Sequence, residues 1–212
     1  MSSNQIGALF MMASMACFTL NDAFMKVTDG AIPLFQLLFL RGILTTILIV
    51  ALALWLKSLH FNIARRDWKL IAMRSAAEMA TAYFFITALF NMPLANVTAT
   101  LQALPLTVTL GGALFFREAV GWRRMSAISI GFLGMLLIVR PGSEGFNIYG
   151  IYALLAVLGV TVRDLVTRQL SADVPSMTVT LAASLTVMTF SGIASTASPW
   201  APISGTHALM VI

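Results

Sequence analysis

The chain has 212 residues, of which 59% are hydrophobic and only 10% are charged. Soluble domains carry about 25% charged residues, so this composition excludes a soluble globular domain, a disordered chain and a nucleic-acid-binding module. Lipid must be the main solvent, and the net charge of +5 is expected to set membrane topology rather than attract nucleic acid. The single cysteine, Cys17, excludes an intrachain disulfide.

Seven apolar runs are long enough to cross a bilayer as helices, because roughly 20 apolar residues span its core. Continuous runs exclude a β-barrel, whose strands alternate apolar and polar residues. An eighth run begins near His207. The seven predicted spans cover residues 6–27, 33–56, 68–90, 93–116, 125–139, 148–170 and 175–197.

Basic residues are concentrated in the loops after the second, fourth and sixth spans, whereas only Lys26 and Arg140 adjoin the opposite loops. Because cytoplasmic loops carry the excess of Lys and Arg, we expect a multi-pass protein of a bacterial-type inner membrane with a cytoplasmic N-terminus. Trp55, Trp68 and Trp122 lie near helix ends on the same side, where tryptophan anchors at the lipid interface. The basic residues of these loops are Lys57, Arg65, Arg66, Lys69, Arg117, Arg123, Arg124 and Arg168.

An internal repeat appears when the sequence is shifted by 142 residues, which places the first span on the sixth. One repeat holds five spans, an odd number, so the second copy must enter the membrane from the other face, as in an inverted-topology repeat. This predicts a first repeat over 1–143 and an incomplete second repeat over 144–212, about seven and a half helices of an expected ten. The aligned pairs are Ile6 with Ile148, Thr19 with Thr161, Asp22 with Asp164, Lys26 with Arg168, and Pro33 with Pro175.

Several short motifs occur in an order and spacing that resemble one family. Span two opens with PLFQLLFLRG from Pro33, and spans three and four are joined by YFFITALFNMPLANVT from Tyr83. Pro105, FRE ending at Glu118, and GFLG from Gly131 follow, before RPG. The chain thus resembles an EamA-type member of the drug/metabolite transporter superfamily that is truncated at its C-terminal end. The resemblance implies an all-α integral membrane bundle of two five-helix repeats, a central cavity, transport of a small organic metabolite, and homodimers in some members.

Two charged residues lie near the middle of predicted spans. Arg41 is eight residues inside span two and Glu78 is ten residues inside span three, which at 1.5 Å per residue puts both near the midplane. Since the two spans are consecutive and antiparallel, we expect these residues to meet. Intramembrane charges are costly and mark function by default, so the pair is either a structural ion pair or a substrate or proton site.

Two further acid–base pairs have i,i+4 spacing and are related by the repeat. Asp22 with Lys26 lies near one end of span one, and Asp164 with Arg168 lies near the opposite end of span six. Either these are helix ends whose long side chains reach water, or they are symmetric gates of an alternating-access carrier. Arg163 would strengthen the second gate.

Span four carries polar residues that are candidates for substrate contact or for interhelical hydrogen bonds, chiefly Asn96 and Gln102. Pro105 is expected to kink this span. Glu118 is expected to brace a basic loop. Ala127 and Gly131 form a small-residue step that suits helix contact in a homodimer.

The sequence contains no Gly-rich phosphate loop, no metal-binding histidine pair and no nucleophile elbow. We therefore expect no catalytic residue, no metal, no cofactor and no enzymatic activity. The predicted function is secondary-active transport of a small organic metabolite across the lipid bilayer by alternating access. The alternative is a truncated half-carrier that acts as a non-transporting structural or regulatory membrane subunit.

Overall fold

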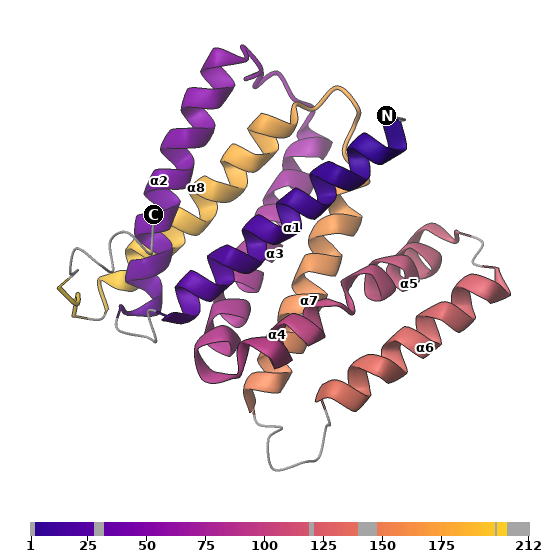
Figure 1. The fold of residues 1–212 in the computed structure, drawn as a ribbon. Helices are drawn as coiled ribbons and strands as arrows, with labels where there is room; N and C mark the ends of the chain where they lie inside the picture. Colours follow the sequence, from indigo (N-terminus) through magenta and orange to yellow (C-terminus); the bar gives the residue numbers. More distant parts are fainter. Residues whose placement is uncertain (1–2, 28–31, 119–120, 140–147, 198, 203–212) are drawn as a thin grey trace.

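The computed structural model describes residues 3–27, 32–118, 121–139, 148–197 and 199–202. Every regular element in this part of the chain is a helix, so the predicted all-α fold is confirmed (Figure 1). The helices are α1 (Ser3–Val27), α2 (Leu34–Trp55), α3 (Arg65–Asn91), α4 (Leu94–Leu101), α5 (Leu104–Phe116), α6 (Trp122–Val139), α7 (Ile148–Thr167) and α8 (Ser176–Ser195). The predicted repeat boundary, Arg140 and the eighth apolar run lie outside the described residues.

Five segments are long and apolar enough to cross a bilayer: α1, α2, α4 with α5, α7 and α8. The other two predicted spans are also helical. They are α3, with 27 residues, and α6, with 18. Arg74 and Glu78 interrupt the apolar run of α3, so its hydropathy is lower than that of the other spans although it is the longest described helix.

The fourth predicted span is broken, as Pro105 suggests. Helix α4 ends at Leu101 and α5 begins at Leu104, with Pro105 in the first turn of α5. Proline lacks an N–H group and its ring clashes with the carbonyl group four residues earlier, so the hydrogen-bond ladder cannot continue through it. The backbone N–H of Ala103 instead donates to the carbonyl oxygen of Thr100 at 3.1 Å, which tightens the turn between the two helices.

The helices form two antiparallel pairs. Helix α2 lies along α8, and α3 lies along α7, while α3 also contacts α8 and so joins the two pairs (Figure 1). Helix α5 contacts α7, and α6 lies at the edge of the bundle. Helix α1 runs across the outside, and most of its large apolar side chains are exposed, as is expected of a face that contacts lipid.

The main apolar core lies at the end of the bundle where α1 leads into α2. Its members come from α1, α2, α3, α4 and α7, and include Leu37, Leu89, Val97 and Ala153, which are almost fully buried. Five helices therefore converge there, and the charged groups described below lie above and beside this core.

Candidate substrate site and gates

The contact between α3 and α7 has three polar levels, which we call the charged seam. At the first level, Arg74 Nε donates to Thr167 Oγ1 at 3.1 Å. At the second, Glu78 contacts Arg163. At the third, Thr81 lies against Gly159, where an added Cβ would be 2.3 Å from the Thr81 hydroxyl oxygen. The spacing of four and three residues on α3, and of four on α7, places each set on one helix face.

Glu78 and Arg163 form the centre of the charged seam. Arg163 Nη1 lies 3.2 and 3.3 Å from the two carboxylate oxygens of Glu78, and Arg163 Nε donates to Asp164 at 3.0 Å. Glu78 is at the midpoint of α3, thirteen residues from each end. The side chains of Arg163 and Glu78 are 27% and 30% exposed, so this is a partly desolvated ion pair rather than a surface one.

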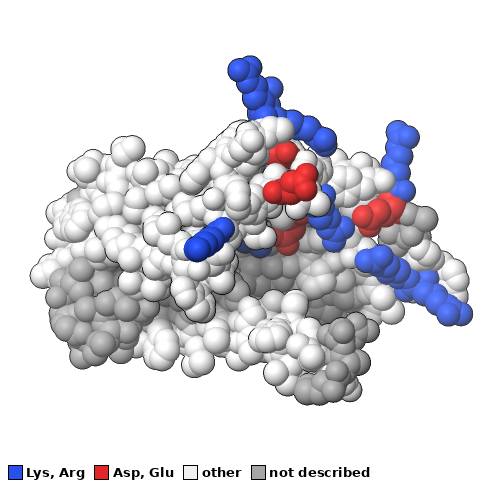
Figure 2. Space-filling view, turned by 90° about the horizontal axis from the view of Figure 1, so that it is seen from above, with Lys and Arg blue, Asp and Glu red and all other residues white. Residues whose placement is uncertain are grey.

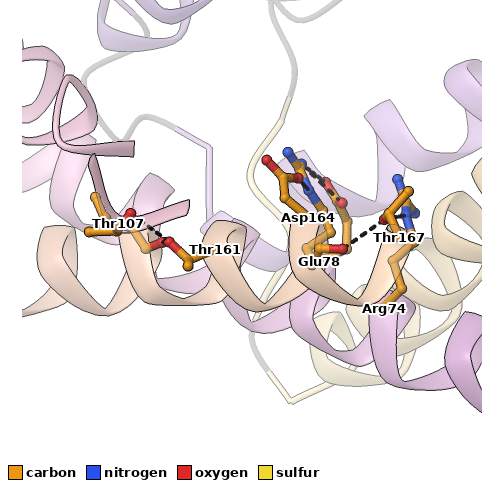
Figure 3. Close-up of polar contacts among 8 residues, drawn as sticks. Arg74, Glu78, Thr107, Thr161, Asp164 and Thr167 are labelled. Carbon is orange, nitrogen blue, oxygen red and sulfur yellow. Dashed lines mark hydrogen bonds and ion pairs between the residues drawn. The ribbon is translucent and has the colours of Figure 1, made fainter. Parts of the chain in front are cut away.

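The polar contacts lie in a row along α7 (Figure 3). Thr107 and Thr161 are at one end, with their hydroxyl oxygens 2.7 Å apart. Glu78 and Asp164 follow, and Arg74 with Thr167 lies at the other end. Helix α7 thus presents polar groups to α5 and to α3 over its last two turns.

The charged seam contains donors that are not used. Arg74 Nη1 and the hydroxyl groups of Ser75 and Thr81 are buried and have no hydrogen-bond partner in the described part of the chain. Buried polar groups are normally paired, so a group of three on one helix calls for an explanation. Arg74 is the charged member, and it lies one turn from Glu78.

Arg41 lies in a second polar cluster, with Asn21, Asp22 and Met25 of α1. Its Nη2 donates to Asn21 Oδ1 at 2.7 Å, and its Nη1 contacts the Met25 sulfur. The Asn21 amide in turn lies 3.3 Å from an Asp22 carboxylate oxygen. Asp22 is only 7% exposed, so the Asn21 side chain links a buried carboxylate to Arg41.

The predicted contact between Arg41 and Glu78 is therefore wrong. Arg41 contacts α1, and Glu78 contacts α7. The expectation assumed that consecutive antiparallel helices are neighbours, but α2 lies mainly along α8 and α3 lies along α7. Each of the two charged residues instead contacts the helix that lies against it, α1 for Arg41 and α7 for Glu78.

The two predicted i,i+4 ion pairs do not form either. Lys26 donates to the Phe90 carbonyl oxygen at 3.0 Å, near the C-terminal end of α3, where a positive charge favours the helix dipole. Asp164 pairs with the adjacent Arg163, and Arg168 reaches Glu118 at 3.4 Å. Glu118 thus braces α7 rather than the basic loop beside it.

The contact between α2 and α8 is close and uncharged, and we call it the glycine seam. A Cβ added at Gly42 would lie 2.8 Å from the Cβ and 3.0 Å from the Cα of Met188, so the two backbones are nearly in contact. One turn away, the hydroxyl oxygens of Thr46 and Ser184 are 2.9 Å apart. No charged residue occurs in α8, so dispersion and neutral hydrogen bonds hold this seam together.

The other predicted site residues are not drawn into either cluster. Asn96 is half-buried on α4, and Gln102 is exposed at the break before α5. Ala127 is exposed, while an added Cβ at Gly131 would lie 2.9 Å from a Leu106 methyl group of α5. Gly131 of this small-residue step therefore packs against α5 within the same chain.

Aromatic rings from four helices lie beside the charged seam. Tyr83 stacks on Phe35 of α2 with ring centroids 6.0 Å apart, and Phe84 meets Tyr152 of α7 edge-on at 5.4 Å. Phe190 of α8 packs edge-on against Phe35. The rings are in contact with one another, so in this conformation they pack the helices together.

Basic residues gather at the end of the bundle that holds the α2–α3, α5–α6 and α7–α8 connections. Figure 2, seen from above, shows Lys and Arg side chains projecting around this end, with Asp and Glu side chains between them. Arg163 and Thr167 lie in the last turns of α7, before the α7–α8 connection, whereas Asn21 and Arg41 lie near the end of α1 and the start of α2.

The profile of the EamA-like transporter family matches residues 5–140, more than half of the chain. The protein belongs to this family. It is an EamA protein whose described helices include five long enough to span a membrane, so it is a multi-pass membrane protein. No solved structure matches the chain significantly.

Curated relatives of this EamA protein are named as transporters of different metabolites. A pseudopaline exporter of Pseudomonas aeruginosa is 25% identical over 78% of this chain and 58% of the exporter. A riboflavin transporter of Brucella anthropi is 32% identical over 48% of this chain and 33% of that protein. An S-adenosylmethionine uptake transporter of Rickettsia bellii is 20% identical over 77% of this chain and 56% of that protein. The matched part of the chain thus spans between a third and little more than half of the length of these relatives.

Sequence reasoning missed Arg74, Asn21 and Gly159. Arg74 is four residues before Glu78, and this i,i+4 spacing was a usable signal. Asn21 is adjacent to Asp22, but nothing in the sequence indicates that it bridges to Arg41. Gly159 matters only because Thr81 faces it, which the sequence alone does not reveal.

Proposed function

We propose that this EamA protein is a secondary-active transporter of a small organic metabolite, and that it works by alternating access rather than by catalysis. The observation that carries the proposal is the charged seam. Glu78, at the midpoint of α3, forms an ion pair with Arg163 on α7, a helix of the predicted second half. Charged side chains at such a depth are costly in a bilayer. Such charges are retained where a substrate or ion must bind.

The positions of the two charged clusters favour gating. The α7 residues of the charged seam lie near the end of α7, and the Arg41 cluster lies near the α1–α2 connection, where α7 begins rather than ends. The repeat places Asn21 of α1 at the position of Arg163 in α7, and Asp22 at that of Asp164. Related positions at opposite ends thus hold arginine–oxygen contacts, as a carrier that opens alternately to each side requires.

The glycine seam is the proposed pivot. Adding 142 to Gly42 and subtracting 142 from Met188 gives Ser184 and Thr46. These two residues are hydrogen-bonded across the same seam. The repeat thus exchanges the two sides of this contact, α2 and α8. Such an exchange is expected where a twofold axis in the membrane plane passes between the two helices, and this supports the inverted repeat. Rocking about such an axis would move the charged seam and leave the pivot intact.

The proposed orientation places the basic end in the cytoplasm and the N-terminus on the same side, in the inner membrane. It rests on the excess of Lys and Arg at that end (Figure 2). The charged seam would then be the cytoplasmic gate and the Arg41 cluster the outer gate.

Transport is tested in proteoliposomes that contain the protein, with each probe added in excess to the outside solution. Riboflavin and S-adenosylmethionine are suitable probes, because relatives are named for them. The proposal predicts saturable uptake of at least one probe, lost in Arg163→Gln and kept in Arg66→Gln, a control on the exposed start of α3. Uptake equal to that of empty liposomes for both probes and for a wider metabolite panel would contradict it, and would favour the non-transporting subunit.

A further inference from the structure

The charged seam holds more cationic donors than its carboxylates use. Arg163 Nη1 contacts both oxygens of Glu78, and Arg163 Nε contacts Asp164. Arg74 Nε donates a hydrogen bond to the neutral Thr167 hydroxyl, and Arg74 Nη1 is buried with no partner in the described part of the chain. Two arginines therefore lie on facing helices, and one buried guanidinium nitrogen of Arg74 is unused within the described residues.

The charges that surround Glu78 are few. On its own helix Arg74 lies one turn away, and on α7 it faces Arg163 and Asp164. Helix α8, which also packs against α3, has no charged residue, and neither has α4 or α5. Asp67 lies three turns earlier on α3, where its buried carboxylate accepts hydrogen bonds from Ser171. The pair formed by Glu118 and Arg168 lies just past the end of α7, and Asp22, Lys26 and Arg41 belong to the opposite cluster. The seam therefore contains two positive and two negative charges.

We infer that Arg163 and Arg74 form a binding site for a carboxylate group of the substrate, and that Glu78 competes with that carboxylate for Arg163. The inference rests on the proposed function and names a substrate class for it, metabolites that carry a carboxylate. Guanidinium groups hold carboxylates in a fixed two-pronged geometry, and two guanidinium groups that converge from facing helices can hold one from both sides.

Charge balance gives the coupling. When the substrate carboxylate occupies Arg163, Glu78 loses its partner, and a charged carboxylate without a partner inside a bundle is strongly unfavourable. Glu78 instead takes one proton from the aqueous side. The seam then again contains two positive and two negative charges, because the substrate carboxylate replaces that of Glu78. By reciprocity, protonation of Glu78 frees Arg163 and favours substrate binding by the same factor.

The site also explains how the gate opens. The Glu78–Arg163 contact is the central link between α3 and α7, so a substrate that replaces Glu78 breaks it. A neutral, protonated Glu78 no longer forms an ion pair with α7. The remaining polar contacts are hydrogen bonds, from Arg74 to Thr167 and from Ser171, just after α7, to Asp67 of α3. Substrate and proton together would therefore break the ion pair without leaving Glu78 charged and unpaired.

Binding of benzoate to the purified protein tests the inference, with benzamide as the matched uncharged probe. Calorimetry should show that benzoate binds the wild type about tenfold more tightly for each unit by which pH falls, until Glu78 is protonated. Glu78→Gln, which cannot ionise, should bind benzoate at least tenfold more tightly at neutral pH and with no dependence on pH. Arg163→Gln should lose benzoate binding, and benzamide should bind none of these proteins.

Arg66→Gln, on the same helix but exposed, serves as the matched arginine control and should keep the wild-type affinity and pH dependence. If Arg163→Gln fails to fold, the double variant Glu78→Gln/Arg163→Gln, which leaves only the more exposed Asp164 without its partner, takes its place. Benzoate binding that survives loss of Arg163, or a pH dependence that survives in Glu78→Gln, would overturn the inference. If the wild type transports solute but Glu78→Gln does not bind benzoate, the inference is also overturned. If the protein binds benzoate but transports nothing, only the transport proposal is contradicted.

Discussion

The two seams that join the predicted halves of the bundle are built on opposite principles. The glycine seam brings the backbones of α2 and α8 almost into contact at Gly42 and Met188 and contains only neutral hydrogen bonds. The charged seam holds α3 to α7 through an ion pair, and α3 carries three buried donor groups that have no partner among the described residues.

This difference indicates which contact can be exchanged. Close packing of a glycine against a neighbouring backbone has no substitute partner, so separating α2 from α8 forfeits the dispersion contacts outright. An ion pair can be replaced by an ion of the same charge, and water or substrate can occupy the freed donors. The molecule therefore combines a contact suited to stay closed with one suited to open.

The largest expected effect is from breaking the ion pair on one side only. Arg163→Gln leaves Glu78 without its cationic partner. A fully buried pair broken in this way costs about 3–5 kcal/mol, and we expect about 2 kcal/mol here because both side chains are partly exposed. The free energy of unfolding, measured by denaturant titration in mixed micelles, should recover most of this loss in Glu78→Gln/Arg163→Gln. Equal or additive losses in the double variant would mean that the pair is not coupled.

Gly42→Ala should destabilise the protein by about 1–3 kcal/mol, because the new methyl group would overlap the Met188 backbone region and force α2 from α8. The matched control is Gly134→Ala in α6, where an added Cβ meets nothing within 4 Å. That change should be neutral or slightly stabilising, since alanine favours helix over glycine by roughly 0.5–1 kcal/mol. Thermal unfolding of both variants decides the matter, and a similar response from the two would argue against close contact at Gly42.

A smaller effect is expected from Gly159→Ala in the charged seam. The obstacle there is the Thr81 hydroxyl, which can rotate away, rather than a backbone atom. We expect a loss below about 1 kcal/mol, since a side-chain rotamer change costs roughly 0.5–1.5 kcal/mol, and recovery in Thr81→Ala/Gly159→Ala. Thermal unfolding of these variants beside Gly42→Ala would rank the two seams. A loss at Gly159 as large as that at Gly42 would contradict the assignment of the tighter contact to α2 and α8.

The sequence was sufficient for the helices and for most of the charged residues that matter, although it did not single out Arg74. Apolar runs predict the spans, Pro105 predicts the break between α4 and α5, and the depth of Glu78 and Arg41 marks them as exceptional. Partner choice was not predictable in the same way. Hydropathy and span order do not reveal that α3 lies along α7, so Arg163, expected only to strengthen a gate, became the partner of Glu78 in place of Arg41.

The proposed motion can be tested most directly by locking each seam in turn. Cys17 is the only cysteine, so a Cys17→Ser background leaves engineered pairs free to form. Thr81→Cys with Gly159→Cys spans the charged seam, where the Cβ atoms would be 3.4 Å apart, and Thr46→Cys with Ser184→Cys spans the glycine seam. Oxidation should abolish transport in the first pair until a reductant is added and should leave the second pair active. Undiminished transport with α3 locked to α7 would contradict the account.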